Sequence, residues 1–135
     1  MLRRLIVAVA FAVCTSPVHA LEPSELIGDW DTWWANAPGQ EPDGGGPMRI
    51  SADTHAQALD GVLPAPGFDG VMNGEVEQRE DGALVWNGRW ASIWAEGTTT
   101  GTFSLIFTDA HTFTGKWSTD DGEVDGAAWN GQRAR

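Results

Sequence analysis

The residues of this sequence that could bind a metal ion form two short Asp-x-His pairs. Asp53 and His55 lie in ISADTH, and Asp109 and His111 lie in the similar stretch IFTDAH. Zinc needs four such ligands, all converging at about 2 Å from one ion. An aspartate also begins turns by bonding to its own backbone, and histidine tolerates positive φ there. We therefore expect two hairpin tips here and no metal site.

The acidic run DDGEVDG at 120–126 partly matches a calcium-binding loop. Asp121, Glu123 and Asp125 occupy its first, third and fifth positions, but the twelfth position is Gln132. A calcium loop needs a bidentate glutamate at that place. A hairpin turn explains the run better, so the sequence predicts no bound cofactor.

Groups that could perform catalysis are scarce. Cys14 is the only cysteine, and His55 and His111 are the only histidines after residue 20. The chain contains no nucleophile elbow and no phosphate-binding loop. With 19 acidic residues, a mechanism based on paired carboxylates stays open as an alternative. The residue types favour binding over catalysis.

Tryptophan is the feature that suggests what is bound, since the chain holds eight. On strands that run from end to end of a barrel, Trp34, Trp94 and Trp117 would point inward near one mouth. Indoles at a mouth stack on sugar faces or hold apolar and cationic ligands. The alternative is that these rings only fill a narrow barrel.

The first twenty residues are expected to be a signal peptide. Arg3 and Arg4 form a basic start, LIVAVAFAV is a short apolar stretch, and VHA ends in small Ala20. The apolar stretch is too short to span a bilayer as a helix. Cleavage after Ala20 would leave one cysteine-free domain, 21–135, in the periplasm or outside the cell, without a membrane span.

The charge of the chain limits its partners. Eight basic residues against 19 acidic ones give −11, and loss of Arg3 and Arg4 with the signal peptide would make this −13. Nucleic acids and anionic membranes require basic patches, so we expect neither as a partner. The charge suits a soluble exported protein, or one with a basic protein partner.

The elements that position these residues are short apolar segments interrupted by Gly, Pro and Asp, which predict an all-β fold. We expect a single antiparallel up-and-down β-barrel or meander of about eight strands. The strands are expected at about 26–34, 47–52, 56–63, 70–79, 83–94, 101–108, 112–118 and 124–133.

An up-and-down order sorts the connections into two ends. The short tips near Asp53, Asp81 and Asp109 share the tight end. The connections at 35–47, 64–70, 95–100 and 118–123 share the open end, together with the acidic residues Glu41, Asp43, Asp69, Glu96, Asp120, Asp121 and Glu123. Binding sites usually lie among the loops at one end of a barrel, so we expect the site at the open end.

Glycine repeatedly stands two residues from tryptophan, as in GDW, WNGRW, GKW and WNG. Residues two apart on a strand share a face. Small barrels alternate small and large residues inside, so each glycine is expected to leave room for the indole beside it.

Gly28 and Trp30 on the first strand, with Arg133 at the end of the last, resemble the lipocalin and calycin barrels. In that family the first-strand tryptophan closes one end and an arginine packs on it. The resemblance implies that Gly28, Trp30 and Arg133 form the closed end here. The family's usual disulfide and length are missing. Avidin-type barrels are also similar in size and tryptophan content, but the polar groups that would hold biotin are not recognisable.

Two functions are compatible with these features. One is an exported, non-catalytic binding protein with a small-ligand or glycan site at Trp34, Trp94 and Trp117. The other is a protein-binding module, such as an inhibitor of a basic hydrolase, that uses the acidic loops. A hollow mouth would favour the first, and a filled barrel with a protruding loop at 35–47 would favour the second.

Overall fold

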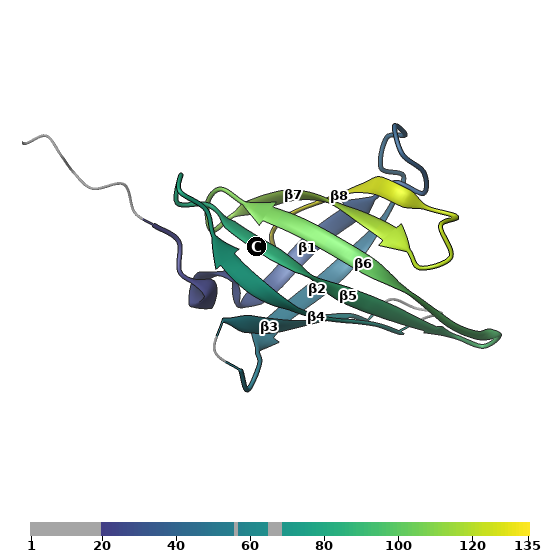
Figure 1. Ribbon diagram of the computed structural model, residues 1–135, viewed down its shortest axis with the longest axis horizontal. Coiled ribbons are helices and arrows are strands. Elements are labelled where there is room, and N and C mark those ends of the chain that lie inside the picture. Colours follow the sequence, from purple (N-terminus) through teal and green to yellow (C-terminus); the bar gives the residue numbers. More distant parts are fainter. Residues whose placement is uncertain (1–19, 56, 65–68) are drawn as a thin grey trace, which may run out of the picture.

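Eight antiparallel strands close into a barrel in a computed structural model that describes residues 20–55, 57–64 and 69–135 (Figure 1). Each strand pairs with its neighbours in sequence, and β1 also pairs with β8. The strands are β1 (Gly28–Trp34), β2 (Gly44–Ala52), β3 (Ala58–Leu63), β4 (Asp69–Gln78), β5 (Leu84–Trp94), β6 (Gly97–Phe107), β7 (Thr112–Thr119) and β8 (Asp125–Arg133). The expected all-β up-and-down barrel is confirmed.

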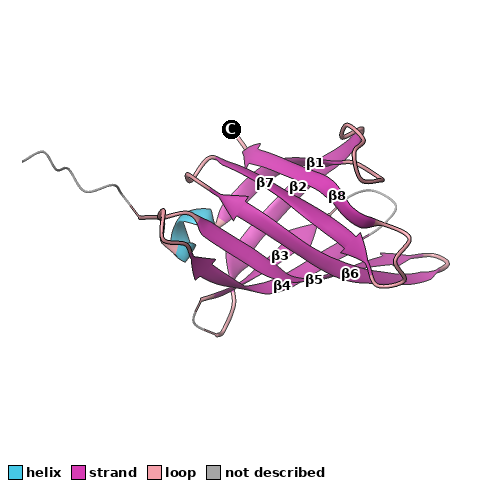
Figure 2. Ribbon diagram, turned by 45° about the horizontal axis from the view of Figure 1, so that its top comes forward, coloured by secondary structure: helices cyan, strands magenta, loops and turns pink. Residues whose placement is uncertain are grey.

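A single turn of 3₁₀ helix, η2 (Pro23–Leu26), precedes β1 and is the only helix in the described part of the chain. It lies at the end of the barrel where β1 begins, on the opposite side from the loops at 35–43 and 120–124 (Figure 2). None of the described residues forms a helix long and apolar enough to cross a membrane. The signal peptide expected at 1–20 lies, apart from its last residue, outside the described residues.

β2 begins earlier than the sequence predicts, because its partner strand extends that far. Gly44, Gly45 and Gly46 pair with Trp34, Trp33 and Thr32 of β1. A ladder of backbone hydrogen bonds to an existing strand overrides the weak strand preference of glycine. The open-end loop expected at 35–47 is therefore shorter and covers only 35–43.

β6 also begins early, at Gly97. Thr98, Thr99 and Thr100 pair with the end of β5 instead of forming a loop. The connection expected at 95–100 is therefore wrong, and only the turn at 95–96 remains. Threonine suits a strand because its branched side chain packs well on a pleated surface.

At the tight end, aspartates make the turns as expected. Asp109 Oδ1 accepts the backbone N–H of His111 at 2.7 Å, and Asp53 Oδ1 accepts that of His55 at 2.9 Å. The expected positive φ at the histidines is wrong. Among the described residues, Gln57 alone has a positive φ without being glycine, at 65°. The carboxylates therefore shape these tips without a left-handed histidine.

The core fills the half of the barrel nearest η2. Its largest fully buried side chains are Trp30, Trp86, Phe107, Leu26, Met48, Ile50, Leu84 and Leu105. The Trp30 and Phe107 rings meet edge to face at 5.2 Å, and Phe107 packs on Phe113 at 5.1 Å. Burial of a large apolar side chain contributes roughly 1.5–3 kcal/mol, so this half supplies much of the stability.

The glycines make room across strands and not along them. A Cβ on Gly101 of β6 would lie 2.7 Å from the Trp90 ring of β5. Gly88 stands between Trp86 and Trp90 in sequence, yet it faces the β4 backbone at Gly74. The expectation that each glycine accommodates the indole two residues away is therefore wrong. The small and large residues alternate between neighbouring strands.

Candidate functional site

At the end of the barrel next to η2, the three residues that the sequence singled out lie in contact with one another. The Arg133 guanidinium lies 4.4 Å from the Trp30 ring centroid, and its Nη1 donates to the Ile27 carbonyl at 2.9 Å. Trp30 Nε1 donates to the Leu26 carbonyl at 2.9 Å. Gly28 has a φ of 136°, and a Cβ there would lie 2.8 Å from Arg133 Nη1. Leu26 and Trp30 are fully buried, so this end of the barrel is packed around them.

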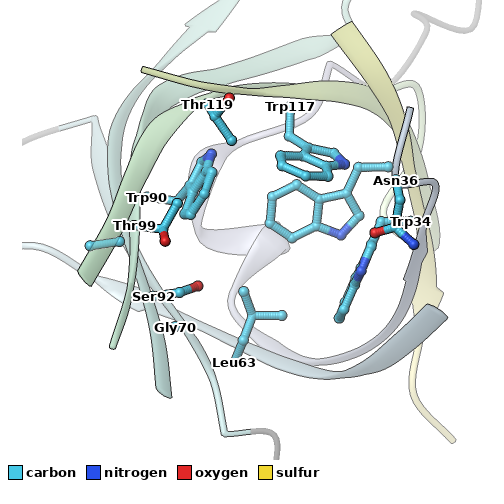
Figure 3. A pocket seen from close by; sticks show the side chains of 11 residues that line it. Trp34, Asn36, Leu63, Gly70, Trp90, Ser92, Thr99, Trp117 and Thr119 are labelled. Carbon is cyan, nitrogen blue, oxygen red and sulfur yellow. The ribbon is translucent and has the colours of Figure 1, made fainter. Parts of the chain in front are cut away.

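The opposite end is hollow. A cavity of about 220 Å³ opens between the loops, and its walls are mostly apolar (Figure 3). Its lining consists of four indoles and a set of smaller side chains: Trp34, Trp90, Trp117 and Trp129, with Asn36, Leu63, Gly70, Ala91, Ser92, Thr99 and Thr119.

One wall of the cavity is a row of mainly small residues across four strands. Leu63 of β3 pairs with Gly70 of β4, which pairs with Ser92 of β5, which pairs with Thr99 of β6. Glycine has no side chain and serine a short one, so this wall stays away from the barrel axis. The cavity exists because no large side chain from this row fills the space.

The rest of the lining is mainly aromatic. Trp34 of β1 pairs with Trp129 of β8, and their rings meet edge to face at 6.3 Å. Trp90 and Trp117 make a second edge-to-face pair at 5.7 Å. Figure 3 shows Trp34 and Trp90 on opposite sides of the cavity, with Trp117 along the side between them. A flat ligand would therefore meet indoles on more than one side.

Backbone carbonyls fix two of these indoles in place. Trp90 Nε1 donates to the carbonyls of Thr102 and Ser118, both at 3.1 Å. Trp117 Nε1 donates to the Ala35 carbonyl at 3.0 Å. Because these rings are held before any ligand arrives, binding does not have to order them.

Two of the acidic residues expected around the mouth, Asp120 and Asp121, accept hydrogen bonds from neighbouring groups of the protein. Thr100 Oγ1 at 2.5 Å and the Arg89 guanidinium both donate to Asp120, and together they lower the pKa of its carboxyl. The backbone N–H of Glu123, at 2.9 Å, likewise lowers the pKa of Asp121. Among the described residues, no carboxylate lines the cavity.

These contacts also account for the run that resembles a calcium loop. Asp121 Oδ1 accepts from Thr119 Oγ1 at 2.7 Å as well as from the Glu123 backbone, which makes a hairpin turn. Within the described ranges, no three His, Cys, Asp or Glu side chains are arranged to hold a metal ion.

The structure places two of the three tryptophans expected to bind a ligand in the cavity wall, and it does not describe the side chain of the third. Trp34 and Trp117 both line the cavity. Trp94 is the last residue of β5, and its side chain lies outside the described part of the structure. Trp90 and Trp129 also line the cavity, although they were not among the tryptophans expected to bind a ligand.

No protein-family model matches the chain, and no curated protein matches it. Among solved structures, it is similar to a redesigned β-barrel, mFAP1, solved bound to DFHBI. The TM-score is 0.59 at 17% sequence identity, over 84% of this chain and 97% of that chain. At this identity the likeness shows the fold alone. This chain therefore shares its fold with a barrel that has been solved with a bound molecule.

Proposed function

We propose that this protein is an exported, non-catalytic binding protein that takes a small, largely apolar ligand at its open end. The observation that carries the proposal is the hollow mouth, a cavity of about 220 Å³ with four indoles in its walls. An apolar cavity of about 150 Å³ binds benzene. A ligand of about two fused rings is therefore the right size.

The lining favours an apolar ligand over a glycan. A buried sugar hydroxyl without a partner costs about 1–3 kcal/mol. Among the described lining residues, Ser92 and Thr99 offer hydroxyls, while the Thr119 hydroxyl already donates to Asp121 and the Asn36 amide to Asp43. These are few partners for a hydroxyl-rich ligand, whereas the indole faces suit a flat apolar one.

The start of the domain supports export. Leu21, the first residue after the expected cleavage site, is 5% exposed. Its carbonyl accepts a hydrogen bond from Gln78 Nε2 at 2.8 Å. The first residue after the expected cleavage site thus packs against the barrel, which fits a single mature domain of 21–135 in the periplasm or outside the cell.

A fluorescent, uncharged probe tests the proposal. 1-Naphthylamine, an uncharged two-ring probe, should bind the 21–135 protein with a change in its fluorescence, and Ser92→Leu should weaken binding at least tenfold. The leucine would occupy the space that the small row leaves open. Thr98→Leu is the matched control, because Thr98 neighbours Thr99 on β6 and does not line the cavity. Equal affinities in the two variants would refute a site in the cavity.

The alternative function, a protein-binding module for a basic partner, makes a different prediction. Its contacts would come from exposed acidic residues such as Glu41 and Glu123, which lie on the open-end loops. Ser92→Leu would then leave binding of a basic protein unchanged. The open cavity is the reason for preferring the small ligand.

A further inference from the structure

We infer that the ligand carries an uncharged hydrogen-bond acceptor that receives the indole N–H of Trp129; this inference rests on the proposed function. Trp129 lines the cavity and is 4% exposed. Its Nε1 is the one buried side-chain nitrogen or oxygen among the described residues that has no hydrogen-bond partner.

Four other inward-facing indoles have the acceptor that Trp129 lacks. Trp30 and Trp86 of the core donate to the carbonyls of Leu26 and Gly74, at 2.9 and 3.1 Å. In the cavity, Trp90 and Trp117 donate to carbonyls as well. Buried polar groups are nearly always paired, so an exception in the wall of a cavity needs an explanation, and an acceptor on the ligand supplies one.

The acceptor should be uncharged. Among the described residues, the cavity lining contains neither a cationic nor an anionic side chain. An anion buried there would lose its hydration without a charged partner, in a protein whose formal charge is −11. A ring nitrogen or a carbonyl on a flat two-ring molecule meets both requirements.

Trp129 Nε1 is buried, so a neighbouring side chain must move before the ligand's acceptor can reach it. Trp34 is the neighbour best able to shift. It packs edge to face on Trp129, is only half-buried and ends β1, and its own Nε1 has no acceptor among the described residues. Phe103, the other ring against Trp129, is 4% exposed and belongs to the core.

Quinoline and naphthalene test the inference, since they share a shape and only quinoline has a ring-nitrogen acceptor. Calorimetric titration at pH 8, where quinoline is uncharged, gives both affinities. Trp129→Phe should weaken quinoline about tenfold more than naphthalene, which corresponds to one buried hydrogen bond. Trp90→Phe is the control. Its N–H already has acceptors in the protein, so its loss should change both affinities by the same factor.

The outcomes separate this inference from the proposed function. If Trp129→Phe leaves the ratio of the two affinities unchanged, the acceptor contact is wrong while the cavity site stands. If the wild-type protein binds neither probe, the proposed function fails and the inference with it. Should Trp129→Phe not fold, the wild-type proton spectrum decides. Quinoline, and not naphthalene, should move the Trp129 indole N–H resonance downfield, and equal shifts would overturn the inference.

Discussion

Replacing Arg133 by alanine should destabilise the barrel far more than any other loss of a surface charge. Its guanidinium is the common partner of three backbone carbonyls, those of Glu25, Ile27 and Ala110, and it also lies over the Trp30 ring. These contacts tie η2, the tip between β6 and β7, and the last strand to one another.

The size of the effect follows from these contacts. Hydrogen bonds to a charged group contribute about 1.5–3 kcal/mol each when buried, and the cation–π contact adds about 0.5–2 kcal/mol. The Arg133 contacts are only partly buried, and water can replace the donor at the exposed carbonyl of Ile27. We therefore expect a total loss of about 2–4 kcal/mol, or a fall of about 10 °C in Tm for a domain of this length.

Urea unfolding followed by tryptophan fluorescence measures the loss directly. Arg135→Ala is the matched control, since Arg135 is exposed and makes no hydrogen bond or ion pair within the described residues. Arg133→Lys should fall between the two, because lysine keeps the charge but lacks the planar fork that reaches several carbonyls. If Arg133→Ala and Arg135→Ala unfold at the same urea concentration, the closed-end assignment is wrong.

Three further changes test the barrel and its turns. Gly101→Ala should lower stability by about 1–3 kcal/mol or more, because its Cβ would clash with the Ser118 backbone carbonyl oxygen and lie 2.7 Å from the Trp90 ring; thermal unfolding measures this. The backbone N–H of His111 lowers the pKa of the Asp109 carboxyl, so the folded state binds fewer protons than the unfolded chain. The stability that this carboxylate contributes is fully present above its ordinary pKa of about 3.9, and it is lost as the pH falls through the lower pKa of the folded state. Asp109→Asn should therefore lose less stability than wild type between pH 6 and pH 3. His55→Asn and His111→Asn should each unfold within about 0.5 kcal/mol of wild type, because the turns depend on the backbone N–H that asparagine keeps.

Each of these predictions has a control or a contrary result. Gly46→Ala introduces the same methyl group with nothing within 4 Å, so it should not destabilise the protein as Gly101→Ala does. If the stability of Asp109→Asn falls as steeply as that of wild type when the pH is lowered, the Asp109 carboxylate does not cause the pH dependence. Loss of a bound metal in either histidine variant would overturn the assignment of these residues to turns.

The fold was predictable because its turns are encoded locally. Asp81 and Gly82 form a hairpin tip in which Asp81 Oδ1 accepts the Ala83 N–H at 3.1 Å and Gly82 has a φ of 90°. Such signals need no knowledge of the rest of the chain. Strand ends were harder to predict, as at Gly44–Gly46 and Gly97, because pairing with a longer neighbour decides where a strand begins.

The site was predictable only in part. Alternation along a strand shows which residues face inward, and it placed Trp34 and Trp117 correctly toward the interior. Whether an inward-facing indole packs in the core or lines the cavity depends on its position along the barrel axis. For Trp90 and Trp129 that position follows from cross-strand register, as in the pairing of Trp34 with Trp129, which no single segment encodes.

The most direct test of the central claim, a ligand site in the open-end cavity, is a titration of the ¹⁵N-labelled protein with an uncharged two-ring probe such as quinoline. The indole N–H signals report on both halves of the barrel at once. Those of Trp34, Trp90, Trp117 and Trp129 should shift with a common affinity, while those of the core residues Trp30 and Trp86 should stay unchanged. Saturable shifts confined to Trp30 and Trp86, or no saturable shift in the four cavity indoles, would contradict the account.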